Sequence, residues 1–171
     1  MKKFWLIVSI VTLLASIALA QETGTAKKLD AGLRLGVMNN RGGLVARYAL
    51  SEKTRIEAAI TTPGFNGTIY TGLFEMTFPL GDVTNLSWYF GGGLHMGYWG
   101  SAPSRWSAVT STWVSTKFAI GIDAIAGIQY NMESLVSFPL TLSLDYKPAW
   151  DFTSTWADQW GDVALSLRYA F

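Results

Sequence analysis

Side chains alternate between apolar and polar character along eight separate segments of the chain. In the last segment, from Val163 to Phe171, every second residue is apolar or aromatic, whereas Ala164, Ser166, Arg168 and Ala170 between them are small or polar. A period of two places the two sets of side chains on opposite faces of a β-strand. The alternation therefore predicts a chain built from strands that each have two different faces.

Turn-forming residues such as Gly, Pro, Asn and Asp separate these segments. The expected strands are Leu29–Val37, Leu44–Leu50, Arg55–Thr61, Tyr70–Phe78, Trp88–Tyr98, Lys117–Tyr130, Phe138–Lys147 and Val163–Phe171. A tilted strand needs ~9–11 residues to cross a bilayer, and most of these segments have about that length. An even number of strands also lets the first and last strand pair, which closes the sheet and removes its edges.

Charged residues fall on only one face of the expected strands. They are Asp30, Arg34, Arg47, Arg55, Glu57, Glu75, Lys117, Asp123, Asp145, Lys147 and Arg168. The opposite face is rich in bulky Phe, Tyr, Trp, Leu and Ile, and the interior of an eight-stranded barrel is just wide enough for packed side chains. The sequence therefore predicts an all-β fold, an eight-stranded antiparallel up-and-down transmembrane β-barrel with its apolar face toward lipid. The alternatives are a soluble barrel of the lipocalin type, with the apolar face inside, and an ordinary soluble sheet.

Basic and acidic residues are nearly balanced on the face that we expect to line the lumen. Buried charge is tolerated only when it is paired and hydrogen-bonded. We therefore expect an ion-pair network that plugs the barrel, with Arg47, Glu57 and Glu75 among its central members. The alternative is a narrow conducting path that opens when the same charges change partners.

The amino-terminal residues have the features of a secretory signal peptide. Lys2 and Lys3 precede an apolar run from Phe4 to Leu14, and Ala18-Leu19-Ala20 fits a small-x-small cleavage pattern. The run is shorter than the ~20 residues of a spanning helix, which disfavours a retained anchor. We expect a signal peptide over residues 1–20, a short periplasmic segment over 21–28 and the barrel over 29–171. The chain has no cysteine, so a disulfide framework and a thiolate metal site are excluded.

The connections between the expected strands differ in length. If the first strand starts in the periplasm, the turns at Ser51–Lys53, Pro79–Asn85 and Asn131–Val136 are periplasmic, and the long loops Trp99–Ser115 and Pro148–Gly161 lie outside. These loops contain Trp99, Trp106, Trp113, Trp150, Trp156 and Trp160. Exposed tryptophan indicates a platform for an extracellular glycan or protein ligand, or an extension of the aromatic girdle at the membrane surface.

The end of the chain resembles the assembly signal of bacterial outer-membrane barrels, which ends in Phe with an aromatic residue two positions earlier, here Phe171 and Tyr169. Leu144-Asp145-Tyr146-Lys147-Pro148-Ala149 is similar to a run in the outer-membrane β-barrel domain of the Bacteroidetes. As a whole, Leu29 to Phe171 resembles the small eight-stranded outer-membrane proteins, such as the membrane domain of OmpA and OmpX. The resemblance implies a monomer in outer-membrane lipid that the barrel assembly machinery recognises through the last strand.

Some small outer-membrane barrels are enzymes, among them a lipid A palmitoyltransferase that depends on a histidine. The single histidine here is His95, which Asp123 could orient as a general base near Ser101 or Ser104. No motif supports this grouping, so we expect no enzyme, no cofactor and no metal site. The near-neutral charge gives no sign of nucleic-acid binding. The expected function is a structural or surface-interaction role in the outer membrane, with a small pore as the alternative and a lipid-modifying enzyme as a more distant one.

Overall fold

The computed structural model describes residues 28–38, 41–63, 67–99, 104–107, 112–115, 118–152 and 158–171. The strands are β1 (Leu29–Gly36), β2 (Arg41–Ala49), β3 (Thr54–Pro63), β4 (Gly67–Pro79), β5 (Leu86–Trp99), β6 (Ser104–Ser107), β7 (Thr112–Ser115), β8 (Phe118–Asn131), β9 (Leu140–Asp151) and β10 (Asp158–Ala170). One short helix, α2, covers Glu133–Val136. Within the described ranges no helix is long and apolar enough to span a membrane.

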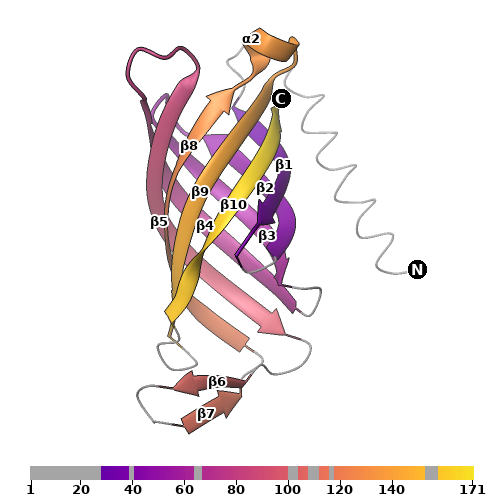
Figure 1. The fold of residues 1–171 in the computed structure, drawn as a ribbon, viewed down its shortest axis with the longest axis vertical. Helices are drawn as coiled ribbons and strands as arrows, with labels where there is room; N and C mark the ends of the chain where they lie inside the picture. The colour runs from indigo at the N-terminus through magenta and orange to yellow at the C-terminus, as the bar shows by residue number, and fades with distance from the viewer. Residues whose placement is uncertain are drawn as a thin grey trace, which may run out of the picture.

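Eight of the strands form a closed antiparallel barrel in the order β1-β10-β9-β8-β5-β4-β3-β2 (Figure 1). The first and last strands complete it, in a register that runs from Asp30↔Ala170 to Gly36↔Ala164. The strands β6 and β7 form a separate two-stranded sheet. The predicted fold class, an eight-stranded antiparallel up-and-down barrel, is confirmed.

The barrel has two ends that differ in their connections. At one end, which we call the turn end, successive strands are joined by residues 50–53, 80–85 and 132–139. The helix α2 and the carboxyl terminus lie at the same end (Figure 1). At the opposite end, the hairpin end, β6 and β7 stand beyond the barrel wall (Figure 1). Two turns at the turn end are tied together, because Asn85 Nδ2 donates to Ser134 Oγ at 3.1 Å.

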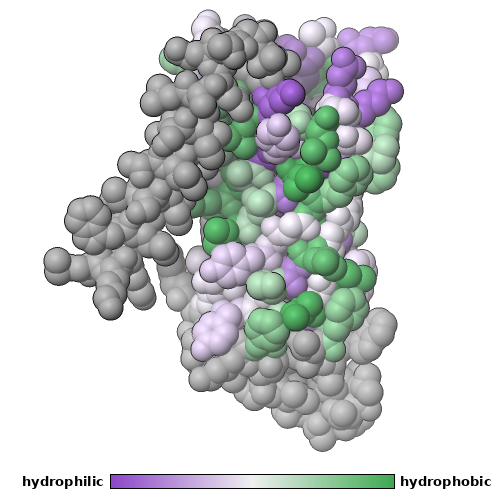
Figure 2. All heavy atoms as spheres, turned by 180° about the vertical axis from the view of Figure 1, so that it is seen from behind, coloured by the Kyte–Doolittle hydropathy of each residue, from purple (hydrophilic) through white to green (hydrophobic). Residues whose placement is uncertain are grey.

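The two faces of each strand differ in the way the alternation predicts. Phe74, Ile122 and Leu142 point outward, with 49%, 39% and 37% of their surface exposed. Arg47 and Glu75 point inward and are 2% and 0% exposed. Seen from behind, apolar side chains cover much of the described barrel wall, and polar ones gather toward the turn end (Figure 2). The expected orientation is confirmed, and the inverted arrangement of a soluble barrel is excluded.

Aromatic side chains form contacts on the outer wall near the turn end. The ring centroids of Phe78 and Trp88 lie 5.2 Å apart, and those of Trp88 and Phe90 lie 5.5 Å apart. Tyr169 and Phe171 meet edge to face at 5.1 Å. Girdles of aromatic residues at the level of the lipid headgroups are typical of membrane barrels.

The two expected long loops are shorter than the sequence predicts, because each contains strand. The hairpin β6–β7 lies within Trp99–Ser115, and β9 and β10 extend into Pro148–Gly161. Proline normally ends a strand because it has no N–H to donate. Here β9 continues past Pro148, and the β8–β9 ladder skips that position, running from Asp123↔Ala149 to Ala126↔Tyr146.

Candidate functional site

Opposite charges face one another across neighbouring strands in the half of the lumen near the turn end. Arg47 on β2 lies directly opposite Glu57 on β3, and Arg55 on β3 lies directly opposite Glu75 on β4. Arg47 Nε is 2.5 Å from Glu57 Oε2, and Arg55 Nε is 2.6 Å from Glu75 Oε2. Arg47 Nε is also 3.5 Å from Glu75 Oε2, which joins the two pairs into one cluster.

Two neutral side chains connect this cluster to the opposite wall. Gln129 Oε1 on β8 accepts hydrogen bonds from Arg47 Nη1 at 3.1 Å and Arg55 Nη1 at 2.7 Å. The guanidinium carbons of both arginines lie over the ring of Tyr89, 4.6 and 4.5 Å from its centroid. In the barrel order, β2 and β8 are diametrically opposite. The hydrogen bond from Arg47 to Gln129 therefore crosses the whole lumen.

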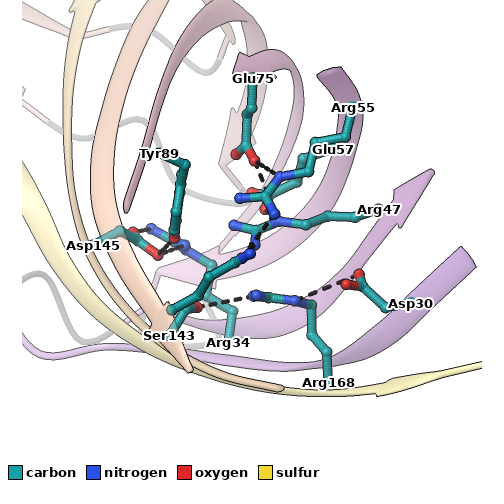
Figure 3. A network of polar contacts seen from close by, with 11 residues as sticks. Asp30, Arg34, Arg47, Arg55, Glu57, Glu75, Tyr89, Ser143, Asp145 and Arg168 are labelled. Atoms are coloured by element: carbon teal, nitrogen blue, oxygen red, sulfur yellow. Dashed lines mark hydrogen bonds and ion pairs between the residues drawn. The ribbon is translucent and has the colours of Figure 1, made fainter. Parts of the chain in front are cut away.

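The remaining charges of this half form two groups, one joined to the cluster by Tyr89 and the other around Arg168 (Figure 3). Arg34 on β1 binds Asp145 on β9 through two hydrogen bonds, of 2.9 and 2.5 Å, and Tyr89 Oη donates to the same carboxylate at 2.9 Å. Arg168 Nη1 donates to Ser143 Oγ at 2.9 Å, and its Nε is 3.5 Å from Asp30 Oδ1. We call Asp30, Arg34, Arg47, Arg55, Glu57, Glu75, Tyr89, Gln129, Ser143, Asp145 and Arg168 the central network.

A second polar cluster lies on the hairpin-end side of the central network. His95 Nδ1 is 2.8 Å from Asp123 Oδ2, and His95 Nε2 is 2.7 Å from Asp151 Oδ1. Lys147 Nζ donates to the other oxygen of Asp123 at 2.6 Å. We call these four residues the histidine cluster; it links β5, β8 and β9.

The contacts of His95 bear on the enzyme hypothesis. A general base needs a free ring nitrogen that can take a proton from a nucleophile. Both ring nitrogens of His95 are engaged by carboxylates here. Ser101 lies outside the described residues, as does the side chain of Ser104. In the described geometry, His95 links β5 to β8 and β9 through these two carboxylates.

The structure places most of the predicted lumen residues in two groups. Asp30, Arg34, Arg47, Arg55, Glu57, Glu75, Asp145 and Arg168 belong to the central network, and Asp123 and Lys147 belong to the histidine cluster. Lys117 lies outside the described residues. Tyr89 and Gln129 also belong to the central network, and the sequence places both on the inward face of their strands. They were not predicted as members because the prediction considered only charged residues.

Two buried carboxylates were missed by the sequence analysis. Asp151 and Asp162 are 1% and 3% exposed. Asp151 falls in the expected outer loop Pro148–Gly161, and Asp162 falls between that loop and the last expected strand. A signal was available, because Asp151 continues the inward phase of Asp145 and Lys147. Pro148 concealed it by suggesting that the strand had already ended.

The tryptophans of the expected outer loops are only partly described. Trp150 lies on β9 and is exposed. The backbones of Trp106 and Trp113 pair with each other across β6 and β7, and Trp99 and Trp160 belong to β5 and β10. The side chains of these last four, and the whole of Trp156, lie outside the described residues. Across the described part of the chain, no group of three or more His, Cys, Asp or Glu side chains could hold a metal ion.

Comparisons with known proteins agree with this architecture. No family model and no curated protein matches the chain. Among solved structures, a transmembrane β-barrel from de novo design is similar at 15% identity, over 86% of this chain and 98% of that chain, with a TM-score of 0.56. Neisserial surface protein A (NspA) is 12% identical over 84% of this chain and 95% of its own, with a TM-score of 0.49. At such low identity the likeness to the designed barrel concerns the fold alone, and the chain has the fold of an eight-stranded transmembrane β-barrel.

Proposed function

We propose that the protein is an integral outer-membrane β-barrel protein with a structural or surface-interaction role, and that the central network closes its lumen. The observation that carries the proposal is the 3.1 Å hydrogen bond from Arg47 Nη1 to Gln129 Oε1, which joins diametrically opposite strands. A contact across the full diameter interrupts the axis of the lumen at that level, and the other side chains of the central network pack beside it.

The burial of the same residues supports a closed lumen. Arg34, Arg47 and Arg168 are 2%, 2% and 1% exposed, and Tyr89 is fully buried. Guanidinium groups remain in such an environment only when carboxylates compensate them, because transfer of an unpaired charge out of water costs several kcal/mol. Each of these arginines has a carboxylate within 3.5 Å, so the plug is stable as a packed unit.

Conductance across a planar bilayer tests the closed lumen. The refolded wild-type barrel is expected to give no unitary current steps. The matched variant Tyr89→Ala with Gln129→Ala removes the ring under the two guanidiniums and their shared acceptor, and it is expected to conduct. Reproducible unitary steps in the wild type would show that the small-pore alternative is correct. A silent double variant that folds normally would show that these two side chains do not seal the lumen.

The proposed location rests on both ends of the chain. The sequence predicts a signal peptide over residues 1–20, and the last strand ends on the aromatic pair Tyr169 and Phe171 that resembles an assembly signal. Both rings lie on the outer wall beside the closing strand pair, where the assembly machinery would have access to them. Fractionation of the envelope and amino-terminal sequencing test this; the mature chain is expected in the outer membrane, beginning at Gln21.

A surface-interaction role would use the hairpin end. Five of the six tryptophans of the expected outer loops belong to strands that reach that end: Trp99, Trp106, Trp113, Trp150 and Trp160. A glycan array with the refolded protein tests this role against a variant in which the tryptophans of both expected outer loops are replaced by serine. Binding that the variant loses supports a platform. Equal signals from both proteins would leave the tryptophans as a membrane girdle.

A further inference from the structure

We propose that the protein binds a small oxyanion of the phosphate class in a cavity at the turn end of the lumen. The cavity has a volume of about 170 Å³. Its lining includes Lys28, Arg47, Lys53, Arg55 and Thr77. The cavity lies at the mouth of the central network and shares Arg47, Arg55 and Gln129 with it, but binding at this mouth does not require that the lumen be closed.

Two ion pairs of the central network, Arg47–Glu57 and Arg55–Glu75, present their cationic sides to the cavity, whereas the pair of Arg168 and Asp30 presents Asp30. Arg47 and Arg55 line it, whereas Glu57 and Glu75, which pair with them, do not. The side chain of Arg55 is 11% exposed and that of its partner Glu75 is 0% exposed. Because Arg47 and Arg55 lie closer to the cavity than Glu57 and Glu75 do, these two pairs make the electrostatic potential in the cavity more positive.

Three residues that line the cavity each have a buried hydrogen-bond donor without a partner in the described part of the chain. Arg47 Nη2, Arg55 Nη2 and Thr77 Oγ1 are buried and have no hydrogen-bond partner among the described residues. A buried donor without a partner is unfavourable, so a ligand that supplies an acceptor gains from binding there. Arg47 Nη1 and Arg55 Nη1 both donate to Gln129 Oε1, so the two guanidiniums lie close together. An oxyanion carries several acceptor oxygens and can serve a pair of guanidiniums at once.

The rim of the cavity carries charges of both signs. Lys28 and Lys53 favour an anion, whereas Asp30 and Glu52 oppose it. Asp30 Oδ1 is 3.5 Å from Arg168 Nε, which reduces its influence on the cavity. Lys53 and Glu52 are exposed neighbours outside the central network, so each can be changed without breaking a buried contact. They form a matched pair for a test by charge.

The oxyanion could come from free phosphate or from the headgroup of a lipid in the leaflet at the turn end. Isothermal titration calorimetry distinguishes the two. The full mature barrel is refolded in a neutral, phosphate-free detergent and titrated with inorganic phosphate, and in a second arm with glycerophosphoglycerol, a soluble lipid headgroup. Stronger binding of the first indicates the free ion, and stronger binding of the second indicates the headgroup; either result supports the site.

The variants give the direction of each effect. Lys53→Gln is expected to weaken phosphate binding roughly five- to tenfold, since it removes one of the positive charges that line a partly solvated cavity. Glu52→Gln is expected to strengthen binding by a similar factor. Asp82→Asn changes the charge of another turn at the same end, away from the cavity lining, and is expected to have no effect. The absence of saturable heat in both arms, or equal affinities for all three variants, would overturn the proposal.

Discussion

Glu75→Gln is the most informative single change in the lumen, because Glu75 serves two arginines. Its Oε2 lies 2.6 Å from Arg55 Nε and 3.5 Å from Arg47 Nε, and the side chain is fully buried. Glutamine keeps the size of the side chain and removes its charge. The variant therefore leaves Arg47 and Arg55 with Glu57 as the remaining carboxylate of their cluster.

The size of the effect follows from these distances. With an effective dielectric constant of about 20, the two contacts contribute attractions of about 6 and about 5 kcal/mol before desolvation. The energy needed to remove a carboxylate from water offsets most of this, and breaking a buried pair by removing one partner typically costs about 3–5 kcal/mol. We expect the free energy of unfolding to fall by about that amount, a large part of the roughly 5–15 kcal/mol that stabilises a folded protein.

Urea unfolding of the barrel in lipid vesicles, followed by tryptophan fluorescence, measures the effect. Glu52→Gln, at an exposed turn beside the same mouth, serves as the control and is expected to change stability by at most about 0.5 kcal/mol. Replacing both partners, Arg55→Met with Glu75→Met, is expected to recover most of the loss, since an apolar pair leaves no uncompensated charge. A loss below about 1 kcal/mol in Glu75→Gln would mean that water reaches this carboxylate, and the reasoning for a closed lumen would be wrong.

Five further substitutions test the wall and the histidine cluster, all by the same unfolding measurement. Phe74→Arg, near the middle of β4, is expected to cost about 2–4 kcal/mol, and Tyr98→Arg, near the end of β5, about 0–1 kcal/mol; equal costs would contradict burial of the wall in lipid. Gly93→Ala is expected to destabilise the barrel, because a Cβ there meets the carbonyl oxygen of Gly72, whereas Gly72→Ala meets open space and should be neutral; similar refolding of both variants would contradict this close approach. His95→Phe removes the donors to two buried carboxylates and is expected to cost about 2–4 kcal/mol, and an unchanged stability would show that the histidine cluster is hydrated.

The wall of the barrel and its nearest ion pairs could be predicted from the sequence because they depend on local rules. Alternation decides which side chains face inward. The short turn at residues 50–53 then sets the register of β2 and β3, which places Arg47 opposite Glu57. Once the face and the register are known, contacts between adjacent strands follow from the positions of the residues along the chain.

Contacts across the lumen could not be predicted in this way. The hydrogen bond from Arg47 to Gln129 depends on the diameter of the closed barrel and the stagger of its strands, and no single segment contains that information. The same is true of Arg34 and Asp145, which lie on strands separated by β10. Asp151 was missed for a local reason, because Pro148 suggested that the strand ended before it.

The pairing of β1 with β10 has a consequence for biogenesis. The two strands come from opposite ends of the barrel sequence, so Asp30 finds Ala170 only after every intervening strand has been made. An open sheet edge in the hydrocarbon core of the bilayer would leave backbone N–H and C=O groups without hydrogen bonds, and each such group costs several kcal/mol. A chain that lacks its last strands is therefore not stable in the bilayer as an incomplete barrel. Insertion consequently has to wait until β10 has been made, and a chain truncated before β10 cannot close the barrel.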